Sequence, residues 1–337
     1  MEAFFYEKQD NFSVKCGLCS HNCIITHGKR GICQVRENKN GKLTSLVYGQ
    51  VIAKNVDPIE KKPLFHFLPG SFSCSIATVG CNFKCRFCQN SDIAQMPSDN
   101  KGMIAGVYMS PADVVNYALS QGCMSISYTY TEPTVFFEFA YDTAKLAHKN
   151  GLLNVFVTNG YMSEQALKKI APYLDAANVD LKSFSDDFYK KICCAKLSPV
   201  LLTLKRMKEL GIFVEVTTLL IPGLNDDPDQ LNQMAEFIAV ELGRETPWHI
   251  SRFHPAYKLK DKSITSENSL IKAYETGKKH GLFHIYLGNI PESSMENTTC
   301  CNCGKTLIYR RGFNITKNLL KENRCPFCNT DCYIFSV

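Results

Sequence analysis

Residues 78–90 have the sequence Thr78-Val79-Gly80-Cys81-Asn82-Phe83-Lys84-Cys85-Arg86-Phe87-Cys88-Gln89-Asn90, directly after an apolar run that predicts a strand. The three cysteines are spaced C-x3-C-x2-C. Thiolates this close in sequence can hold an iron–sulfur cluster on one loop. Three thiolates bind three irons of a [4Fe-4S] cluster and leave the fourth iron open, and an open metal position distinguishes a reactive site from a closed structural one. The alternatives are a zinc knuckle or buried cysteines without a metal.

Length and composition indicate a globular protein. The chain has 337 residues, of which 45% are hydrophobic and 21% are charged. This is enough for one large domain with appendages or for two ordinary domains. No apolar run approaches the roughly 18 residues of a membrane span. The first residues carry acids where a signal peptide would be basic and then apolar, so we expect a cytoplasmic protein without a membrane partner.

Two further groups of cysteines flank the central loop, and in a reducing cytosol such groups indicate metal ligands rather than disulfides. The first group is spaced C-x2-C-x3-C-x9-C and would close a site for structural zinc or for an auxiliary iron–sulfur cluster, unless its cysteines are purely structural. Its members are Cys16, Cys19, Cys23 and Cys33. The last group forms two C-x2-C pairs at nearly zinc-ribbon spacing, with an auxiliary cluster as the alternative. Its members are Cys300, Cys303, Cys325 and Cys328. Residues 306–311 and 312–320 are predicted to form the hairpin arms of this ribbon.

Between the flanking groups, short apolar runs alternate with segments of helical period. We predict strands at 74–79, 124–130, 154–158, 177–181, 213–220, 249–253 and 284–287. We predict helices at 111–121, 133–149, 163–171, 186–192, 200–210, 228–242 and 267–280. Ser110 before Pro111 and Asp227 before Pro228 are typical helix starts. Repeated alternation of this kind predicts an α/β fold with a parallel sheet covered by helices, and it leaves open whether the sheet is open or a barrel.

The pattern divides the chain into three parts. We expect a four-cysteine metal-binding segment at 1–56, a core at 57–290 and a zinc-ribbon-like segment at 291–337. Residues 57–67 contain two prolines, which exclude a regular helix or a central strand. This stretch is either a solvated linker or a loop that leans over the Cys81 loop with His66 facing inward.

The net charge of +6 is uneven. Residues 300–337 carry six Lys or Arg and two acids, whereas the remainder is nearly balanced. A general affinity for nucleic acid is therefore not indicated. A nucleic-acid-binding ribbon stays a distant alternative, as does an iron–sulfur protein that only transfers electrons.

Several stretches together carry a family resemblance that spans nearly the whole chain. They are Cys16-Gly17-Leu18-Cys19, residues 57–66 followed by Leu68-Pro69-Gly70, the loop 80–90 with Phe87 before its last cysteine, and the ribbon tail. On these features the chain resembles the radical S-adenosylmethionine (radical SAM) enzymes of the AmmeMemoRadiSam system, which are related to the pyruvate formate-lyase activating enzymes. The resemblance implies a radical SAM partial (β/α)6 barrel, a [4Fe-4S] cluster on Cys81, Cys85 and Cys88, and S-adenosyl-L-methionine (SAM) as cofactor.

The resemblance also implies where SAM binds. Tyr130-Thr131-Glu132-Pro133 lies where the activating enzymes have Gly-Gly-Glu-Pro, so Glu132 would accept a hydrogen bond from the SAM amino group. Later strand ends supply the other implied contacts, with His254 at the ribose: Thr158, Asn159, Asp180, Lys182 and His254. The alternatives are a helix-capping acid at Glu132, a surface ion pair of Asp180 and Lys182, and a structural His254. Independently of the resemblance, ligands bind at the carboxyl ends of strands in parallel α/β folds.

The implied activity is that of a radical SAM oxidoreductase. Reductive cleavage of SAM would give methionine and a 5′-deoxyadenosyl radical, which abstracts hydrogen from an unidentified small-molecule or protein substrate. No general base is needed, so we predict no catalytic residue beyond the cluster ligands. The implied partners are a reductant such as flavodoxin or ferredoxin and the other proteins of the AmmeMemoRadiSam system. The alternative function is activation of a glycyl-radical enzyme.

Overall fold

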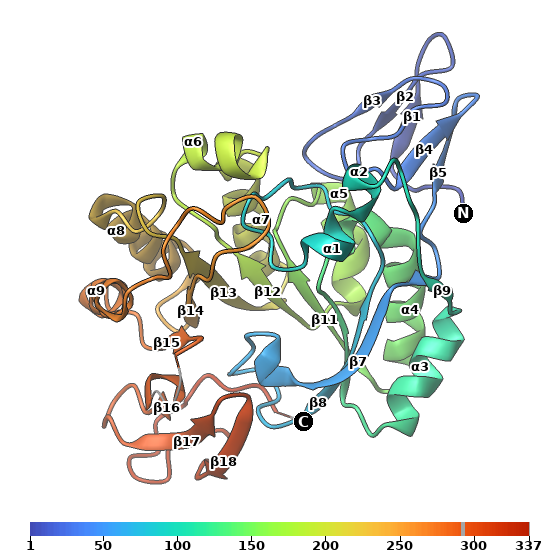
Figure 1. The fold of residues 1–337 in the computed structure, drawn as a ribbon. Helices are drawn as coiled ribbons and strands as arrows, with labels where there is room; N and C mark the ends of the chain where they lie inside the picture. The colour runs from blue at the N-terminus through green and yellow to red at the C-terminus, as the bar shows by residue number, and fades with distance from the viewer. Residues whose placement is uncertain (291–293, 337) are drawn as a thin grey trace.

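The computed structural model describes residues 1–290 and 294–336, and its centre is an eight-stranded sheet (Figure 1). The strand order is β15-β14-β13-β12-β11-β10-β8-β7. β7 (Ala53–Pro58) pairs antiparallel with β8 at one edge, and the other strands are parallel. The parallel strands are β8 (Phe72–Ala77), β10 (Ser125–Tyr128), β11 (Leu153–Thr158), β12 (Ala176–Asp180), β13 (Phe213–Leu220), β14 (Trp248–Arg252) and β15 (Ile285–Gly288).

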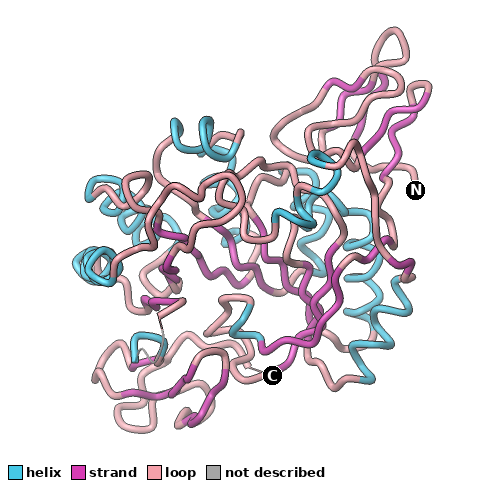
Figure 2. The backbone as a smooth tube through the Cα atoms, viewed as in Figure 1, coloured by secondary structure: helices cyan, strands magenta, loops and turns pink. Residues whose placement is uncertain are grey.

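The parallel strands follow one another in chain order, without the reversal of a doubly wound sheet. Right-handed crossovers then place every helix on the same face, and Figure 2 shows the strands inside and the helices outside. The covering helices are α3 (Pro111–Ser120), α4 (Phe137–Lys149), α5 (Glu164–Ile170), α7 (Leu197–Glu209), α8 (Pro228–Phe237) and α9 (Glu267–Lys279). Within the described residues β15 and β7 do not pair, so the barrel is partial. The predicted fold class is confirmed, with seven parallel strands where the resemblance implied six.

The predicted elements lie within a few residues of the observed ones. Ser110 caps α3 in a reciprocal capping box with Asp113, and Asp227 caps α8, as their sequences predicted. The predicted helix 133–149 differs, because it begins as a 3-10 helix, η2 (Pro133–Phe136), before α4. Two other predicted helices end in π-helical turns, η4 (Tyr189–Cys193) and η5 (Ile238–Leu242). None of the described helices is both long and apolar enough to cross a membrane.

The N-terminal segment packs on the outside of the barrel and shares its core. It contains a small sheet of β1 (Tyr6–Lys8), β2 (Val14–Cys16) and β3 (Ile24–Ile25), followed by the hairpin of β4 (Arg36–Lys39) and β5 (Lys42–Ser45). Val14, Leu18 and Val35 belong to the main hydrophobic core. The buried Arg36 forms an ion pair with the buried Glu138 of α4. A charge pair on opposite elements thus fixes this segment to the barrel.

Most of residues 59–71 are buried, so the solvated-linker alternative is wrong. Leu64, Phe67 and His66 are all fully shielded. His66 faces inward but bonds to Tyr286 of β15 rather than reaching the Cys81 loop, with 2.6 Å between Nε2 and the phenol oxygen. The loop leans inward because its apolar side chains form one buried cluster with Val155 of β11 and Ala176 of β12.

The C-terminal ribbon packs against the same loop. Its strands are β16 (Thr298–Thr299), β17 (Thr306–Arg311) and β18 (Asn314–Asn318), and it has a small core of its own. The predicted hairpin arms correspond to β17 and β18. The backbone of Phe335 exchanges hydrogen bonds with that of His66 and Leu68. Residues 291–293, where we expected this part to begin, lie outside the described residues.

The Arg36–Glu138 pair gives a first prediction. Glu138→Ala leaves a buried guanidinium without its counter-charge and is expected to lower the free energy of unfolding by about 3–5 kcal/mol. Glu236→Ala, on the exposed face of α8, is the matched control and should change it by less than about 0.5 kcal/mol. Urea unfolding of both variants measures the difference. Equal stabilities would show that the pair does not hold the N-terminal segment in place.

Candidate functional site

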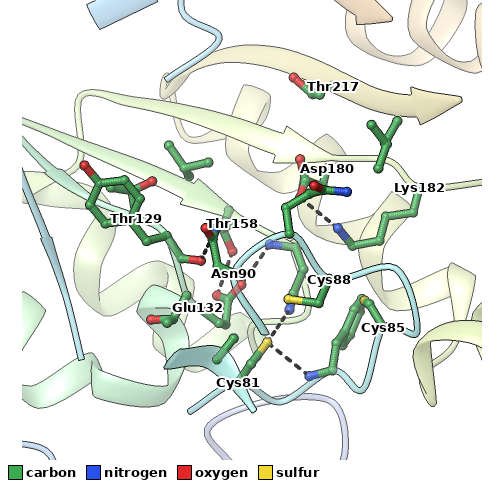
Figure 3. A pocket seen from close by; sticks show the side chains of 18 of the residues that line it. Cys81, Cys85, Cys88, Asn90, Thr129, Glu132, Thr158, Asp180, Lys182 and Thr217 are labelled. Carbon is green, nitrogen blue, oxygen red and sulfur yellow. Dashed lines mark hydrogen bonds and ion pairs between the residues drawn. The ribbon is translucent and has the colours of Figure 1, made fainter. Parts of the chain in front are cut away.

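A cavity of about 420 Å³ opens at the carboxyl ends of the parallel strands. Cys81, Cys85 and Cys88 all line it, and Figure 3 shows them below the strand ends that carry Thr158 and Asp180. Other lining residues come from β10, β11, β12, β13 and β15 or from the loops after them: Thr129, Glu132, Asn159, Lys182, Thr217 and Asn289. We call this the first cavity. The structure therefore brings the cysteine loop to the edge of the sheet where ligands bind.

The cysteine loop begins at Gly80, whose role is seen only in the structure. Gly80 has φ of +99°, and a Cβ atom there would lie 2.5 Å from Val35 Cγ1. Only glycine allows the loop to turn this sharply against the N-terminal segment.

Cys85 lies beside the thiol of Cys193, which is distant in sequence. The hydrogen bond with Cys193, together with burial, raises the pKa of Cys85 well above its usual range. Cys193 does not line the first cavity.

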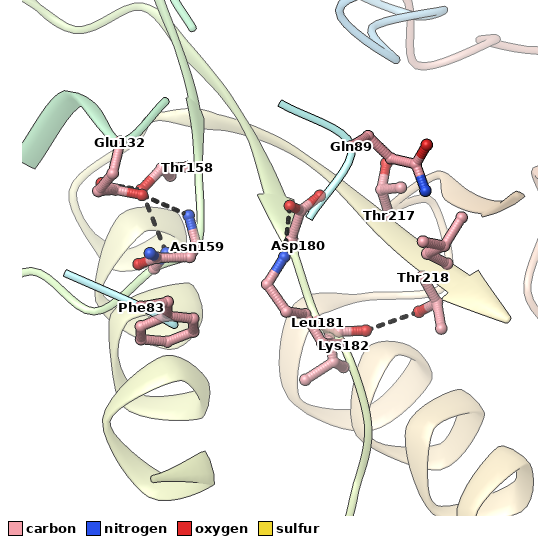
Figure 4. Close-up of polar contacts among 12 residues, drawn as sticks. Phe83, Gln89, Glu132, Thr158, Asn159, Asp180, Leu181, Lys182, Thr217 and Thr218 are labelled. Atoms are coloured by element: carbon pink, nitrogen blue, oxygen red, sulfur yellow. Dashed lines mark hydrogen bonds and ion pairs between the residues drawn. The ribbon is translucent and has the colours of Figure 1, made fainter. Parts of the chain in front are cut away.

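Glu132 joins the ends of two strands. Its carboxylate accepts hydrogen bonds from Thr158 Oγ1 and from the Asn159 backbone, each at 2.8 Å, and from the Thr134 backbone at 3.0 Å (Figure 4). Burial raises its pKa, and these hydrogen bonds oppose the rise. Glu132 is thus both the cap of η2 and a cavity residue, so the capping alternative and the ligand prediction are compatible.

Tyr130 occupies the position of a family glycine and takes a glycine-like conformation, with φ of +62°. Its hydroxyl donates to Asp57, and Lys62 lies over its ring at 4.6 Å. Its backbone oxygen accepts a hydrogen bond from Asn90 Nδ2 at 2.8 Å. These contacts hold a strained backbone in place, and they leave that carbonyl oxygen partly engaged by Asn90.

Two ion pairs border the first cavity. Lys182 Nζ lies 2.7 Å from Asp180 Oδ2, and Lys62 Nζ lies 2.6 Å from Asp57 Oδ2. Burial lowers the pKa of Lys62 to about 8. Burial opposes ionisation of Asp57, but hydrogen bonds from Lys61, Lys62 and Tyr130 outweigh it and hold its pKa below the usual range. Lys62 and Lys182 are therefore each held by a carboxylate.

A second cavity of about 620 Å³ adjoins the first, because Lys61, Ser251 and Asn289 line both. It lies between the ends of β14 and β15, the loop 59–71 and the ribbon. Its walls carry acids, histidines and aromatic rings, namely Glu60, Phe65, His249, His254, Tyr286, Glu296 and Phe313. We call it the second cavity.

Glu60 is a buried acid in the wall of the second cavity. It is 1% exposed, and its Oε1 accepts from the Gly70 backbone at 2.9 Å and lies 3.7 Å from Arg310 Nε. Its Oε2 has no hydrogen-bond partner among the residues that the structure describes. Burial raises the pKa of Glu60, although Arg310 opposes the rise. A buried carboxylate oxygen without a donor is expected to receive one from a ligand.

Comparison with known proteins identifies a domain in the chain. Residues 75–238 match the model of the radical SAM superfamily. The chain contains a radical SAM domain. Over 329 residues the chain is 48% identical to an uncharacterized protein, MJ0808, of Methanocaldococcus jannaschii, covering 97% of each chain. It is also 24% identical to the pyruvate formate-lyase-activating enzyme of Clostridium pasteurianum, covering 54% of this chain and 80% of that one.

Solved structures also match parts of the chain at lower sequence identity. Streptococcus suis SuiB bound to SAM gives a TM-score of 0.48 at 13% identity, covering 66% of this chain and 50% of that one. A domain of a pyruvate formate-lyase-activating enzyme from Bacteroides vulgatus gives a TM-score of 0.44 at 19% identity, covering 49% of this chain and 99% of that domain.

The first cavity fits the cofactors that radical SAM enzymes use, a [4Fe-4S] cluster and SAM. Three thiols line it, and among the described residues no fourth cysteine does. Their sulfurs are not gathered within 4.8 Å of one another, as the ligands of a single zinc ion would be. A carboxylate, an amide and an ion pair converge on the remaining wall. The donor set therefore suits a cluster with one open iron beside a polar, charged ligand.

The structure brings together most of the residues that sequence assigned to the cofactor, with one exception. Glu132, Thr158, Asn159, Asp180 and Lys182 line the first cavity. His254 is exposed and lines the adjoining second cavity instead, and its backbone oxygen accepts a hydrogen bond from Gln89 of the first cavity. Asp180 and Lys182 bond to each other, as the alternative of a surface ion pair expected, but both side chains also line the first cavity.

Sequence reasoning missed several residues of this wall. Lys62, Asn90 and Asn289 line the first cavity but were not assigned to it. A signal existed for Asn90, since it ends the loop that carries the three cysteines. None existed for Asn289, because its contribution depends on where β15 lies in the sheet.

The flanking cysteine groups differ in geometry. Cys16, Cys19, Cys23 and Cys33 line one small cavity. The ribbon group is tighter, because the sulfurs of Cys300, Cys303, Cys325 and Cys328 all lie within 4.8 Å of one another. Among the described residues, this is the one group of three or more His, Cys, Asp or Glu that meets this limit. Such a tight group fits one tetrahedral ion.

The ribbon group gives a second prediction. We expect it to bind about one zinc ion per chain. Cys303→Ala should lose this zinc and lower the melting temperature, because metal binding contributes to folding of so small a core. Cys301→Ala is the matched control, since Cys301 is not one of the four ligands, and should retain the zinc. Mass spectrometry measures the zinc content of each variant. Zinc that stays bound to Cys303→Ala would contradict the assignment.

Proposed function

We propose that this radical SAM protein reductively cleaves SAM at a [4Fe-4S] cluster on Cys81, Cys85 and Cys88 and abstracts hydrogen from a substrate. One observation carries the proposal: three thiols and the strand-end polar residues line the same cavity. When bound, the cluster supplies one electron to the SAM sulfonium, which yields methionine and a 5′-deoxyadenosyl radical. The protein positions the reactants and excludes water.

The residues of this chain have separate tasks in the proposal. Glu132 accepts a hydrogen bond from the SAM amino group, because Oε2 carries only the Asn159 contact. Thr158 and Asn159 fix that carboxylate in place. Asp180 and Lys182 line the same cavity and would contact bound SAM. No side chain needs to act as a general base, so no further catalytic residue is proposed.

Formation of 5′-deoxyadenosine tests the activity. Protein reconstituted with iron and sulfide under anaerobic conditions is expected to form it from SAM and dithionite. Cys85→Ala should abolish the product, because the cluster then has only two ligands on this loop. Cys123→Ala, which lies at the amino end of β10 away from the cavity, should leave the amount unchanged. Absence of product from the native protein would refute the proposed function.

SAM affinity tests the role of Glu132. Glu132→Gln keeps the size of the side chain but removes the charge that would accept the ammonium group. A hydrogen bond between charged groups contributes about 1.5–3 kcal/mol, so the Kd for SAM should rise about 10- to 100-fold. Isothermal titration calorimetry on cluster-loaded protein measures it. The control is Glu236→Gln, and a Kd equal to that of this control would remove Glu132 from the SAM site.

For the substrate, we propose a small molecule bound in the second cavity. This cavity adjoins the first, so a bound molecule would lie near the site where the radical forms. The loop 59–71 and the ribbon occupy the open side of the barrel, where a protein loop would otherwise enter: Arg310 of the ribbon donates to the Phe65 backbone oxygen at 2.8 Å. The unpartnered Glu60 Oε2 supplies an acceptor for a hydroxyl or amino group.

The alternative is a glycyl-radical enzyme activase, as the name of the Clostridium pasteurianum relative suggests.

We also propose that the protein belongs to the AmmeMemoRadiSam system. Its partners would then be the other proteins of that system, with a flavodoxin or ferredoxin as reductant. This proposal is supported by the cysteine segments at both ends of the chain, which accompany the central loop.

Deuterium transfer separates the two functions. Small metabolites and proteins are extracted separately from deuterated cells that naturally contain this protein, and each fraction is added with SAM and dithionite. We expect deuterated 5′-deoxyadenosine with the metabolite fraction, and a lower yield of it with Glu60→Gln than with Glu236→Gln. Deuterium that comes only from the protein fraction would favour the activase and contradict the small-molecule proposal.

A further inference from the structure

The N-terminal cysteines enclose a second candidate metal site. Cys16, Cys19, Cys23 and Cys33 line one small cavity, but their sulfurs are not within 4.8 Å of one another, in contrast to the ribbon group. Zinc–sulfur bonds are about 2.3 Å long, so four thiolates around one zinc lie about 3.8 Å apart. The N-terminal group is therefore spread too widely for a single zinc ion, as are the three cysteines of the central loop. A larger inorganic group fits this spread.

Two buried donors point to what fills the cavity. Arg36 and Asn82 both line it and are 1% and 0% exposed. Arg36 Nη1 donates to Cys16 Sγ at 3.3 Å, whereas within residues 1–290 and 294–336 Arg36 Nε and Asn82 Nδ2 have no hydrogen-bond partner. Buried N–H groups require acceptors. The inorganic sulfides of an iron–sulfur cluster are such acceptors, and N–H bonds to sulfur are a usual feature of cluster sites.

The same residues connect this cavity to the central loop. Asn82 directly follows Cys81, and its backbone oxygen lies 2.8 Å from His21 Nε2 of the N-terminal segment. Asn159 Nδ2 lies 2.7 Å from Asn82 Oδ1 and 3.8 Å from Cys81 Sγ. A Cβ atom on Gly80 would lie 3.1 Å from the Cys33 backbone oxygen. Gly80 and Asn82, which flank Cys81, thus lie directly against the N-terminal segment that carries the other cysteine group.

The N-terminal cysteines lie close to the surface of the protein. Cys19, Cys23 and Cys33 are partly exposed. Ile24 and Ile32, the neighbours of Cys23 and Cys33 in sequence, are 74% and 40% exposed. A carrier protein could approach here, whereas bound SAM would cover the cluster at Cys81, Cys85 and Cys88.

We infer that Cys16, Cys19, Cys23 and Cys33 hold a second [4Fe-4S] cluster, which relays electrons to the cluster that cleaves SAM. This inference rests on the proposed function for its role, but not for its metal. For each SAM cleaved, one electron passes from a reduced flavodoxin or ferredoxin to the N-terminal cluster and then to the central cluster. No atom or proton is transferred in the relay, and the carrier is oxidised by one electron.

Metal analysis of the native protein is the first test. Protein purified and reconstituted without air should contain about eight irons and about one zinc per chain. Electron paramagnetic resonance of the reduced protein should show two cluster signals, of which SAM changes only one. About four irons with about two zinc ions, or a single cluster signal, would overturn the inference. This result stands whether or not 5′-deoxyadenosine forms, so it is independent of the proposed function.

The relay itself is tested with Cys23→Ala. This variant should lose about four irons and keep the signal that responds to SAM. The ratio of flavodoxin-driven to dithionite-driven 5′-deoxyadenosine formation should fall several-fold relative to Cys123→Ala, because dithionite, a small molecule, can reduce the central cluster directly. An unchanged ratio would overturn the relay. If Cys23→Ala does not fold, the same ratio is measured with Ile24→Glu, which places a repelling charge on the approach surface and should also lower it.

Discussion

A buried carboxylate holds the candidate site together. Glu132 pairs with no lysine or arginine among the described residues and is instead surrounded by neutral donors from Thr134, Thr158 and Asn159. Neutral donors stabilise the charge without cancelling it. The same contacts fix the ends of β10 and β11 relative to each other, and Asn159 continues the network to Asn82 in the cysteine loop. One unneutralised acid therefore positions the strand ends and the loop together.

The cations of the site are arranged in the opposite way. Lys62 and Lys182 each bond to a neighbouring aspartate, so neither is a free positive charge in the first cavity. Burial of an ion pair is costly unless its geometry is good, and both pairs have N–O distances below 2.8 Å. This arrangement leaves Glu132 as the unpaired charge on the strand-end wall, which suits a ligand that carries an ammonium group.

The ribbon contributes to the site although it lies outside the barrel. Arg310 of β17 is buried against the ring of Phe65 at 4.2 Å and bonds to the Thr298 hydroxyl at 2.7 Å. Its position depends on the ribbon, whose core is too small to be stable without a cross-link or metal. A metal bound by the ribbon cysteines would thus help to shape the wall of the second cavity. At the other end of the chain, Val35 and the backbone of Cys33 lie against Gly80, where the cysteine loop begins.

The sequence by itself determined the parallel α/β fold, the helix starts at Ser110 and Asp227 and the three cysteine groups, because these depend on local spacing and on the period of apolar residues. It also placed Glu132 and Asp180 at strand ends. Only the tertiary structure decided that most of residues 59–71 are buried, that His254 lines the second cavity and that Asn82 lies between two cysteine groups. These facts depend on which surfaces meet across the open side of the barrel and across the N-terminal segment, and contacts between residues far apart in the chain leave no periodic signal in a single sequence.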